Sequence, residues 1–439
     1  MAGGFLVCVG AGLICGQEAG KATTESLAVT EWVKGAAIRL TGTDPTGDLQ
    51  DMEALGAVIG DARIVAMGEE THGTREFFQL KHRMLEYLVE KKGFTIFAME
   101  ADWPESLSIN EYVVNGTGDA QSALDQLYFW TWNTEEVKEL VQWMRKYNED
   151  PKHAKKIKFS GFDMQLAHVA ARNVLNYLER VDPEQAKAAA RVLAPVSDAE
   201  REKAAKARPG ALWEGEEDRV RVLLRQFESE KAKYVQASSE EEWVIAQHNL
   251  EIVRQAVELY SIKKQGNVSP RDRAMAKNVK WILDQEGPSA KIMLWAHNGH
   301  VSAGMLGGGG AMGKELRRMY GQEMVVCGMS FGEGSFQAIQ PGTGLRQFTV
   351  EKAPEDSVDG VLAATGIPLF AVDLRRVPAN GAAAKWLSKP QKMRSIGAVY
   401  SEGLKNKAFT ETTPRDFDVL FFVQRTTAAR ENPKQTQQR

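Results

Sequence analysis

Hydrophobic positions along the chain gather in short continuous runs instead of alternating with polar ones. Seven runs of strand length are rich in apolar and β-branched residues and end in polar residues. They are Ala62–Met67, Phe94–Met99, Ile157–Gly161, Lys291–Trp295, Met324–Met329, Leu369–Leu374 and Phe417–Val423. Helical patterns lie between them, and apolar strands that alternate with helices are typical of a parallel sheet covered on both faces. We therefore predict an α/β fold with a mostly parallel central sheet flanked by helices.

The strand pattern disappears in the middle of the chain. Between Leu166 and Ile262 the residues are mainly Ala, Glu, Lys and Arg, and the apolar positions recur at helical spacing. Glu217–Ala237 and Glu240–Tyr260 are each predicted to form one long amphipathic helix. We predict that residues 166–264 form an all-helical subdomain inserted into the α/β core.

This insertion divides the predicted core into two parts, residues 26–165 and residues 265–428. At about 150 residues per domain, a chain of 439 residues would hold two or three domains. One α/β core with a helical insertion accounts for a chain of that length. The Gln-rich end of the chain, residues 429–439, is predicted to be a frayed tail.

An apolar run near the start of the chain, Phe5–Cys15, has the length of a secretory signal core and is too short to span a bilayer. Small residues follow it, although no Lys or Arg precedes it. We predict that residues 1–20 are a signal peptide and that the mature protein is periplasmic or secreted, without stable membrane insertion. The alternative is a buried strand or helix at the start of a cytoplasmic protein.

Composition narrows the classes of function. With 43% hydrophobic and 26% charged residues, the chain is ordinary for a soluble globular protein, which excludes disorder, collagen and coiled coil. The formal net charge is −3, so no basic excess exists to bind phosphates, and nucleic acid is not an expected partner. The three cysteines cannot build a four-cysteine zinc site or a disulfide framework. The expected partner is a small molecule.

Polar residues follow directly after four of the predicted strands. They lie in the segments Gly68–Gly73, Glu100–Pro104, Phe162–Gln165 and Ala296–His300. Because ligands bind at the carboxyl ends of parallel strands, we expect these segments to meet at one edge of the sheet. Glu69, His72, Glu100 and His297 would there supply general acid–base chemistry, in which a neutral imidazole takes a proton from water and a carboxylate fixes its tautomer. The alternative for any single one of them is a helix cap or a solvated loop.

Three motifs, each present once, follow one another along the chain in a recognisable order: G-E-x-x-H-G, E-A-D-W-P and W-A-H-N-x-H. They lie in Val65–Pro104 and Trp295–Ser302, and the stretches Trp132–Asn148 and Ser330–Phe336 carry further similarity. In these residues the chain resembles the erythromycin esterase family, from about Ser26 to the final strand at Phe417. The resemblance implies an α/β core with a helical insertion. It also implies an enzyme that opens a lactone by hydrolysis, as the macrolide-resistance members of that family do.

The resemblance further implies roles for individual residues. The family's mechanism is described as metal-independent, with a histidine of the first motif that activates water. By this resemblance His72 would be the general base with Glu69 as its partner, Glu100 the second acidic residue and His297 the second histidine. The family's basic position, often Arg, falls on Lys81. The ammonium of a lysine is a point charge and cannot bind a carboxylate in the bidentate way that a guanidinium does.

Further residues are candidates for substrate binding. His300 is the neighbour of His297 in the last motif. Asp163 ends a predicted strand and is expected either to orient one of the histidines His72 and His297 or to cap a helix.

Aromatic residues near the motifs could line an apolar pocket for a lipophilic substrate. Trp103, three residues after Glu100, is the main candidate, and Trp130 and Trp132 belong to the same group. The alternative for each is ordinary core packing, which is favoured for Trp143 because it lies in a helical pattern.

Two other motifs point to different chemistry. Gly328–Gly332 matches the nucleophile elbow G-x-S-x-G, but no histidine follows His300, so a serine triad is excluded and a glycine-rich turn or the rim of a hairpin is predicted. Gly308–Lys314 nearly matches a phosphate-binding loop but lacks the closing hydroxyl residue. Gly307–Gly310 is instead predicted to be a mobile loop over the site.

These observations together predict a hydrolase of a lactone or another carboxylic ester, which uses a His-activated water, forms no covalent intermediate and needs no cofactor. Two alternatives stay open. Glu69, His72, Glu100 and His297 are also possible ligands for Zn²⁺ or Mn²⁺, so the same set could serve a metal-dependent hydrolase. The chain could also be a non-catalytic exported protein that binds a small molecule.

Overall fold

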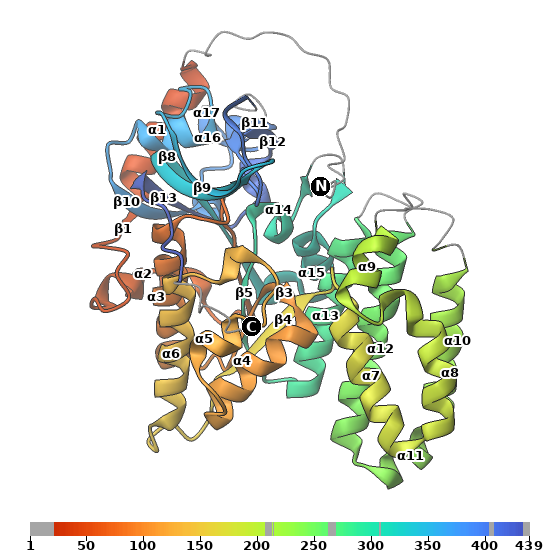
Figure 1. The fold of residues 1–439 in the computed structure, drawn as a ribbon. Coiled ribbons are helices and arrows are strands. Elements are labelled where there is room, and N and C mark those ends of the chain that lie inside the picture. Colours follow the sequence, from red (N-terminus) through yellow and green to blue (C-terminus); the bar gives the residue numbers. More distant parts are fainter. Residues whose placement is uncertain are drawn as a thin grey trace.

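A single mixed sheet lies at the centre of the computed structural model (Figure 1), which describes residues 22–206, 213, 215–261, 269–306, 309–403 and 408–432. In these residues the strand order is β1-β10-β13-β8-β2-β5-β3-β4, and β9 is added to β8. The strands are β1 Ile38–Arg39, β2 Ile64–Met67, β3 Ile96–Asp102, β4 Lys158–Asp163, β5 Ile292–Trp295, β8 Met324–Gln340, β9 Gly344–Val350, β10 Leu369–Asp373 and β13 Val419–Thr426.

The six strands from β13 to β4 run parallel to one another. The pairings of β1, β9 and β10 are antiparallel, and they lie at one edge or at the far end of β8. Each of the seven predicted runs overlaps one strand of the sheet, so the predicted mostly parallel sheet is confirmed. Two small strand pairs lie outside the sheet: β6 Met305–Leu306 with β7 Gly309–Gly310, and β11 Gln391–Arg394 with β12 Phe409–Thr412.

Helices cover both faces of the sheet, which explains why its central strands β2 and β5 are apolar at every position. In β2, Val65 and Met67 belong to one buried cluster, whereas Ile64 and Ala66 belong to the other. The first face is covered by α2 Glu53–Ile59, α3 Arg75–Lys92, α4 Trp103–Asn115, α5 Ala120–Leu124 and α6 Glu135–Glu149. The second is covered by α1 Thr24–Ala36, α13 Pro270–Glu286, α14 Asn298–Val301, α15 Met312–Tyr320, α16 Val358–Ala363 and α17 Ala382–Leu387.

The middle of the chain is helical wherever it is described. Its helices are α7 His168–Val181, α8 Pro183–Leu193, α9 Ala199–Lys206, α10 Glu216–Ser229, α11 Lys231–Ala237 and α12 Glu240–Tyr260. Figure 1 shows them grouped beside the sheet, and they enclose a buried cluster of their own that includes Tyr177, Trp213 and Phe227. All of them fall within the predicted insertion, and α13 then returns the chain to the sheet.

One predicted helix of this subdomain is wrong. The range Glu217–Ala237 is not one helix, because α10 and α11 meet at Glu230, whose backbone angles of φ −92° and ψ 8° are not helical. The break carries neither Gly nor Pro, so no residue in the pattern indicated it. After it, Tyr234 of α11 packs against Phe227 of α10.

The two ends of the chain differ from what was predicted or lie outside the described residues. The predicted signal peptide, residues 1–20, is outside them. Residues 429–432 are not frayed: the backbone N–H of Ala429 donates to the carbonyl of Gly73 at 2.9 Å, and Arg430 forms ion pairs with Glu135 and Glu136 of α6. The rest of the predicted tail lies outside the described residues. Within the described ranges, no helix has the length and apolar character needed to cross a membrane.

Candidate active site

The ends of β2, β5, β3 and β4 are neighbours in the parallel part of the sheet, so the polar segments that follow these strands meet at one edge, as predicted. The first segment fits tightly there. An added Cβ at Gly68 would lie 2.1 Å from Oδ1 of Asn298, and one at Gly73 would lie 2.2 Å from the carbonyl oxygen of Gln337. Only glycine avoids both clashes, and this explains the first and last residues of the G-E-x-x-H-G motif.

His72 and Glu69 form the centre of the site. Nδ1 of His72 lies 2.8 Å from Oε1 of Glu69, which is fully buried. Burial alone would raise the pKa of Glu69, but the charge of Lys81 and the hydrogen bond from His72 outweigh it and lower the pKa. Glu69 is therefore a carboxylate that accepts the Nδ1 proton, and Nε2 of His72 carries the ring's lone pair.

Lys81 completes this group from α3. Its Nζ donates to Oε2 of Glu69 at 2.5 Å and lies 4.4 Å from the ring centre of Trp295. Trp295 also donates its indole N–H to the same oxygen at 2.9 Å. Burial lowers the pKa of Lys81 to about 8, although Glu69 opposes that shift. The predicted basic position thus acts as a single point charge on Glu69.

His297 lies beside His72, with a distance of 5.1 Å between the ring centres. Its Nε2–H donates to the carbonyl of Glu70 at 3.3 Å, and its Nδ1 accepts the backbone N–H of Gly299 at 3.1 Å. Burial, together with the neighbouring His72, lowers the pKa of His297 to about 4. His297 is therefore a neutral imidazole with a fixed tautomer.

Glu100 connects His297 to the next part of the site. Its Oε2 accepts the backbone N–H of His297 at 2.9 Å, and its Oε1 accepts from Arg271 at 2.6 Å. Burial would raise the pKa of Glu100, but the charges of His300 and Arg271 hold it well below its usual range. Glu100 is thus an ionised carboxylate that lies between the side chains of His300 and Arg271.

Asp163 does not orient either of the two predicted histidines. It is fully buried, and its Oδ2 accepts from Nη2 of Arg271 at 2.6 Å. Its Oδ1 accepts the backbone N–H of Met164. The expected contact with His72 or His297 is wrong, because Arg271 lies against this carboxylate and neutralises it.

His300 is held by two carboxylates. Its Nδ1 lies 2.7 Å from Oδ1 of Asp272, and its Nε2 lies 3.3 Å from Oε1 of Glu100 and 3.0 Å from Nη1 of Arg271. Burial would lower the pKa of His300, but the two carboxylates raise it. Its side chain is 21% exposed, more than the 11% of His72.

Sequence reasoning missed three residues of this site: Glu70, Arg271 and Asp272. Glu70 is fully buried, and burial together with the charge of Asp359 raises its pKa well above the usual range. Arg271 and Asp272 follow Pro270 in the first turn of α13. The one available signal was that Pro at the first helical position marks a helix start just after the insertion.

The chain is similar to known proteins over most of its length. A family model described as Erythromycin esterase matches residues 89–426, which is most of the chain. The chain belongs to the erythromycin esterase family. This membership supports a hydrolase.

Relatives and structural neighbours of this family member are distant in sequence. Erythromycin esterase type II of Escherichia coli is 25% identical over 421 residues, which cover 86% of this chain and 95% of that protein. A crystal structure of a protein from Bacillus cereus has a TM-score of 0.82 and 24% identity, with 93% of this chain and 99% of that chain covered. A mutant of the erythromycin esterase EreC in its open conformation has a TM-score of 0.70 and 18% identity, with 91% and 98% covered. At these identities the two structures show a shared fold.

The two aromatic residues Trp132 and Trp103 have different surroundings, one beside the site and the other in the core of the helical subdomain. Trp132 is buried and meets the ring of His72 edge-on, with 5.9 Å between the ring centres. Trp103, predicted to contact substrate, is 3% exposed and packs against His248 and Trp281 in the cluster shared with the helical subdomain. These contacts are those of a core residue, because Trp103, the first residue of α4, lies in the buried cluster of that subdomain.

Of the two competing motifs, the first lies in a strand and not in a turn, and the second is described only in part. Ser330 is not in a turn but inside β8, fully buried, and its hydroxyl donates to Asp359 at 2.7 Å. Gly309 and Gly310 form strand β7, paired with β6, whereas Gly307 and Gly308 lie outside the described residues.

Metal binding gains no support from the arrangement of ligands in this family member. Among the described residues, no group of three or more His, Cys, Asp and Glu side chains is placed to hold a metal ion. The possible ligand oxygens of Glu69 and Glu100 are instead bonded to Lys81, Arg271 and backbone or ring N–H groups.

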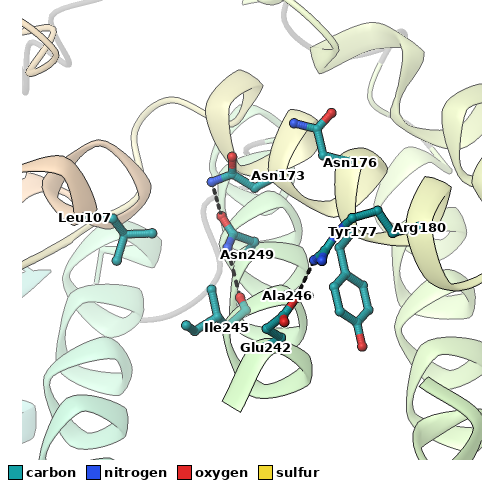
Figure 2. Close-up of a pocket in the computed structure, with 9 residues that line it drawn as sticks. All are labelled: Leu107, Asn173, Asn176, Tyr177, Arg180, Glu242, Ile245, Ala246 and Asn249. Carbon is teal, nitrogen blue, oxygen red and sulfur yellow. Dashed lines mark hydrogen bonds and ion pairs between the residues drawn. The ribbon is translucent and has the colours of Figure 1, made fainter. Parts of the chain in front are cut away.

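A cleft of about 310 Å³ lies away from these residues, on the helical subdomain. Figure 2 shows Asn173 of α7 bonded to Asn249 of α12, and Arg180 paired with Glu242, along this cleft. None of the predicted site residues lines it.

Proposed function

We propose that this protein hydrolyses a lactone or another carboxylic ester by direct attack of a water molecule that His72 activates. The observation that carries the proposal is the 2.8 Å contact between Nδ1 of His72 and Oε1 of Glu69. Because an ionised Glu69 accepts the Nδ1 proton, the lone pair on Nε2 of His72 can take a proton from water. Family membership adds support for hydrolysis.

Lys81 would keep Glu69 ionised, so that His72 can act as a base. The ammonium lies 2.5 Å from Glu69, which favours the carboxylate over the acid. The carboxylate in turn stabilises the imidazolium that forms when His72 takes the proton. Lys81 therefore acts on the base through Glu69 and not on the substrate.

His297 would polarise the ester carbonyl. It is neutral at pH 7, and its Nε2–H is engaged in a long bond of 3.3 Å to a backbone carbonyl. A weakly held N–H beside the base is a suitable donor to the oxygen on which negative charge develops. A group with a pKa of about 4 is, by contrast, a poor source of a full proton at neutral pH.

No covalent intermediate is part of the proposal. Ser330 is buried in β8 and donates to Asp359, with no histidine on its hydroxyl. We expect Ser330→Ala to hydrolyse esters at the wild-type rate. An acyl adduct trapped on Ser330 would contradict the water mechanism.

The experiment is to incubate the protein with a macrolide and with a panel of simple esters and lactones, and to look by mass spectrometry for the addition of one water. We expect turnover that His72→Ala reduces by a factor on the order of 100 or more without loss of the folded state. His153→Ala is the matched control, because His153 stacks on Tyr147 and bonds its carbonyl. Ligand-induced thermal shifts without turnover would favour a binding protein and overturn the proposal.

A further inference from the structure

Two adjacent residues at the start of α13, Arg271 and Asp272, reach the site from a helix and not from a strand end. Nη2 of Arg271 donates to Glu100 and to Asp163, each at 2.6 Å, and Nε also faces Asp163. Asp272 is buried and accepts the backbone N–H of Met312 at 3.0 Å. Both side chains therefore have fixed positions.

These two residues fix the two nitrogens of His300. Nδ1 is 2.7 Å from Oδ1 of Asp272, so it carries a proton in both charge states of the ring. Nε2 lies between a donor, Nη1 of Arg271 at 3.0 Å, and an acceptor, Oε1 of Glu100 at 3.3 Å. A neutral ring can accept from Arg271, and a protonated ring can donate to Glu100, so each protonation state of Nε2 has a partner in place.

We infer that Arg271 and Asp272 are positioning residues which make His300 the group that gives a proton to the departing alkoxide. The inference rests on the ester hydrolysis proposed above. When the C–O bond of the tetrahedral intermediate breaks, its electron pair goes to the leaving oxygen, and the Nε2 proton of His300 goes to that oxygen. Arg271 then donates to the bare nitrogen. The proton that His72 took from water is released to solvent, and His300 is reprotonated from solvent.

The charged surroundings of His300 support this assignment. Carboxylates face it from two elements, Asp272 on α13 and Glu100 at the end of β3, and they raise its pKa. The opposing charge is that of Arg271, which is itself paired with Asp163, and the neighbouring His297 is neutral. Burial and the charge of Arg271 oppose the carboxylates without cancelling them. His300 and Arg271 are also the more exposed side of the site, at 21% and 19%, where a leaving group can depart.

The test compares two esters of the same acid that differ in the leaving group, a 4-nitrophenyl ester and a simple alkyl ester. An alkoxide must be protonated as it leaves, whereas 4-nitrophenolate leaves without a proton. We expect Asp272→Asn and Arg271→Gln to lower kcat for the alkyl ester by a factor on the order of 100 and to leave the 4-nitrophenyl ester within about a few-fold. Asp272→Glu and Arg271→Lys should restore part of the alkyl ester rate. Equal losses on both esters would show a merely structural role and overturn the inference.

A measurement without substrate separates this inference from the proposed function. NMR of the protein labelled with ¹³C and ¹⁵N in its histidine rings follows the titration of His300, whose signal is assigned with His300→Gln. We expect the His300 titration to move to lower pH in Asp272→Asn and to higher pH in Arg271→Gln. Lys280→Gln on the exposed face of the same helix is the control that should not move it. If the wild-type protein cleaves no ester, the proposed function fails, and the proton-donor role fails with it even where the titration shifts appear. If esters are cleaved but His300 titrates alike in all variants, the inference alone is overturned.

Discussion

Lys81 donates to Glu69 at 2.5 Å, and neither side chain is exposed to solvent. Such a pair is costly to break, because removal of one partner leaves a charge in a medium that solvates it poorly. The remaining bonds of Glu69 come from His72 and Trp295. The state of Glu69 therefore links the stability of the sheet edge to the protonation of His72.

Lys81→Met should destabilise the protein and inactivate it together. The substitution keeps the apolar stem but leaves Glu69 uncompensated, at a cost of about 3–5 kcal/mol in the free energy of unfolding. Urea denaturation followed by circular dichroism measures this cost. The exposed control Lys280→Met should change stability by less than about 1 kcal/mol. A Lys81→Met variant with wild-type stability would contradict the importance of this pair.

Activity should fall as the pH rises through about 8, while the protein stays folded. Burial lowers the pKa of Lys81 from 10.5 to about 8 in the folded state. Between these two values the unfolded chain binds more protons than the folded one, so the contribution of Lys81 to stability increases with pH in that window. Loss of its charge nevertheless removes the partner of Glu69. Initial rates and thermal unfolding are measured from about pH 6 to about pH 10, a range that brackets the folded pKa of about 8. As Lys81 loses its proton, the rate should fall while its contribution to stability rises.

At low pH we expect a loss of stability caused by the carboxylates of the site. The charges and hydrogen bonds around Glu69, Glu100 and Asp272 lower the pKa of each below its ordinary value. Their stabilisation is complete above the unfolded pKa values of about 4 and is lost as pH falls through the lower folded values. Thermal unfolding as a function of pH measures this effect. Glu100→Gln should show a smaller acid-induced loss than the wild type, and an equal loss would contradict the assignment.

The sequence pattern predicted the central strands because both faces of the sheet are covered. Ile64, Val65, Ala66 and Met67 are all buried, so each position of that strand is apolar. The two peripheral strands β1 and β9 lack that signal. Strand β1, Ile38–Arg39, has only two residues. In strand β9, Gly344–Val350, four of the seven residues are exposed to solvent. Neither strand stands out from its polar surroundings.

The site was predictable where a functional residue directly follows an apolar run. Glu69, His72, Glu100 and His297 all have that position. Arg271 and Asp272 do not, because they stand in a polar stretch at a helix start, and their burial depends on contacts with distant strands. Spacing along the chain carries no information about such contacts.

Trp103→Ala should test whether this residue belongs to the core and not to the substrate site. Trp103 is 3% exposed, with ring centres 4.5 Å from His248 and 5.4 Å from Trp281, so its truncation leaves a cavity between the sheet and the helical subdomain. We expect a cost of about 3–5 kcal/mol in the free energy of unfolding. The milder Trp103→Phe should cost less, because it keeps an aromatic ring in the same space. In both variants KM for the alkyl ester should stay within about two-fold at a temperature where they are folded, because a core residue that does not contact the substrate is energetically independent of it. A large rise in KM with unchanged stability would restore Trp103 to the substrate site.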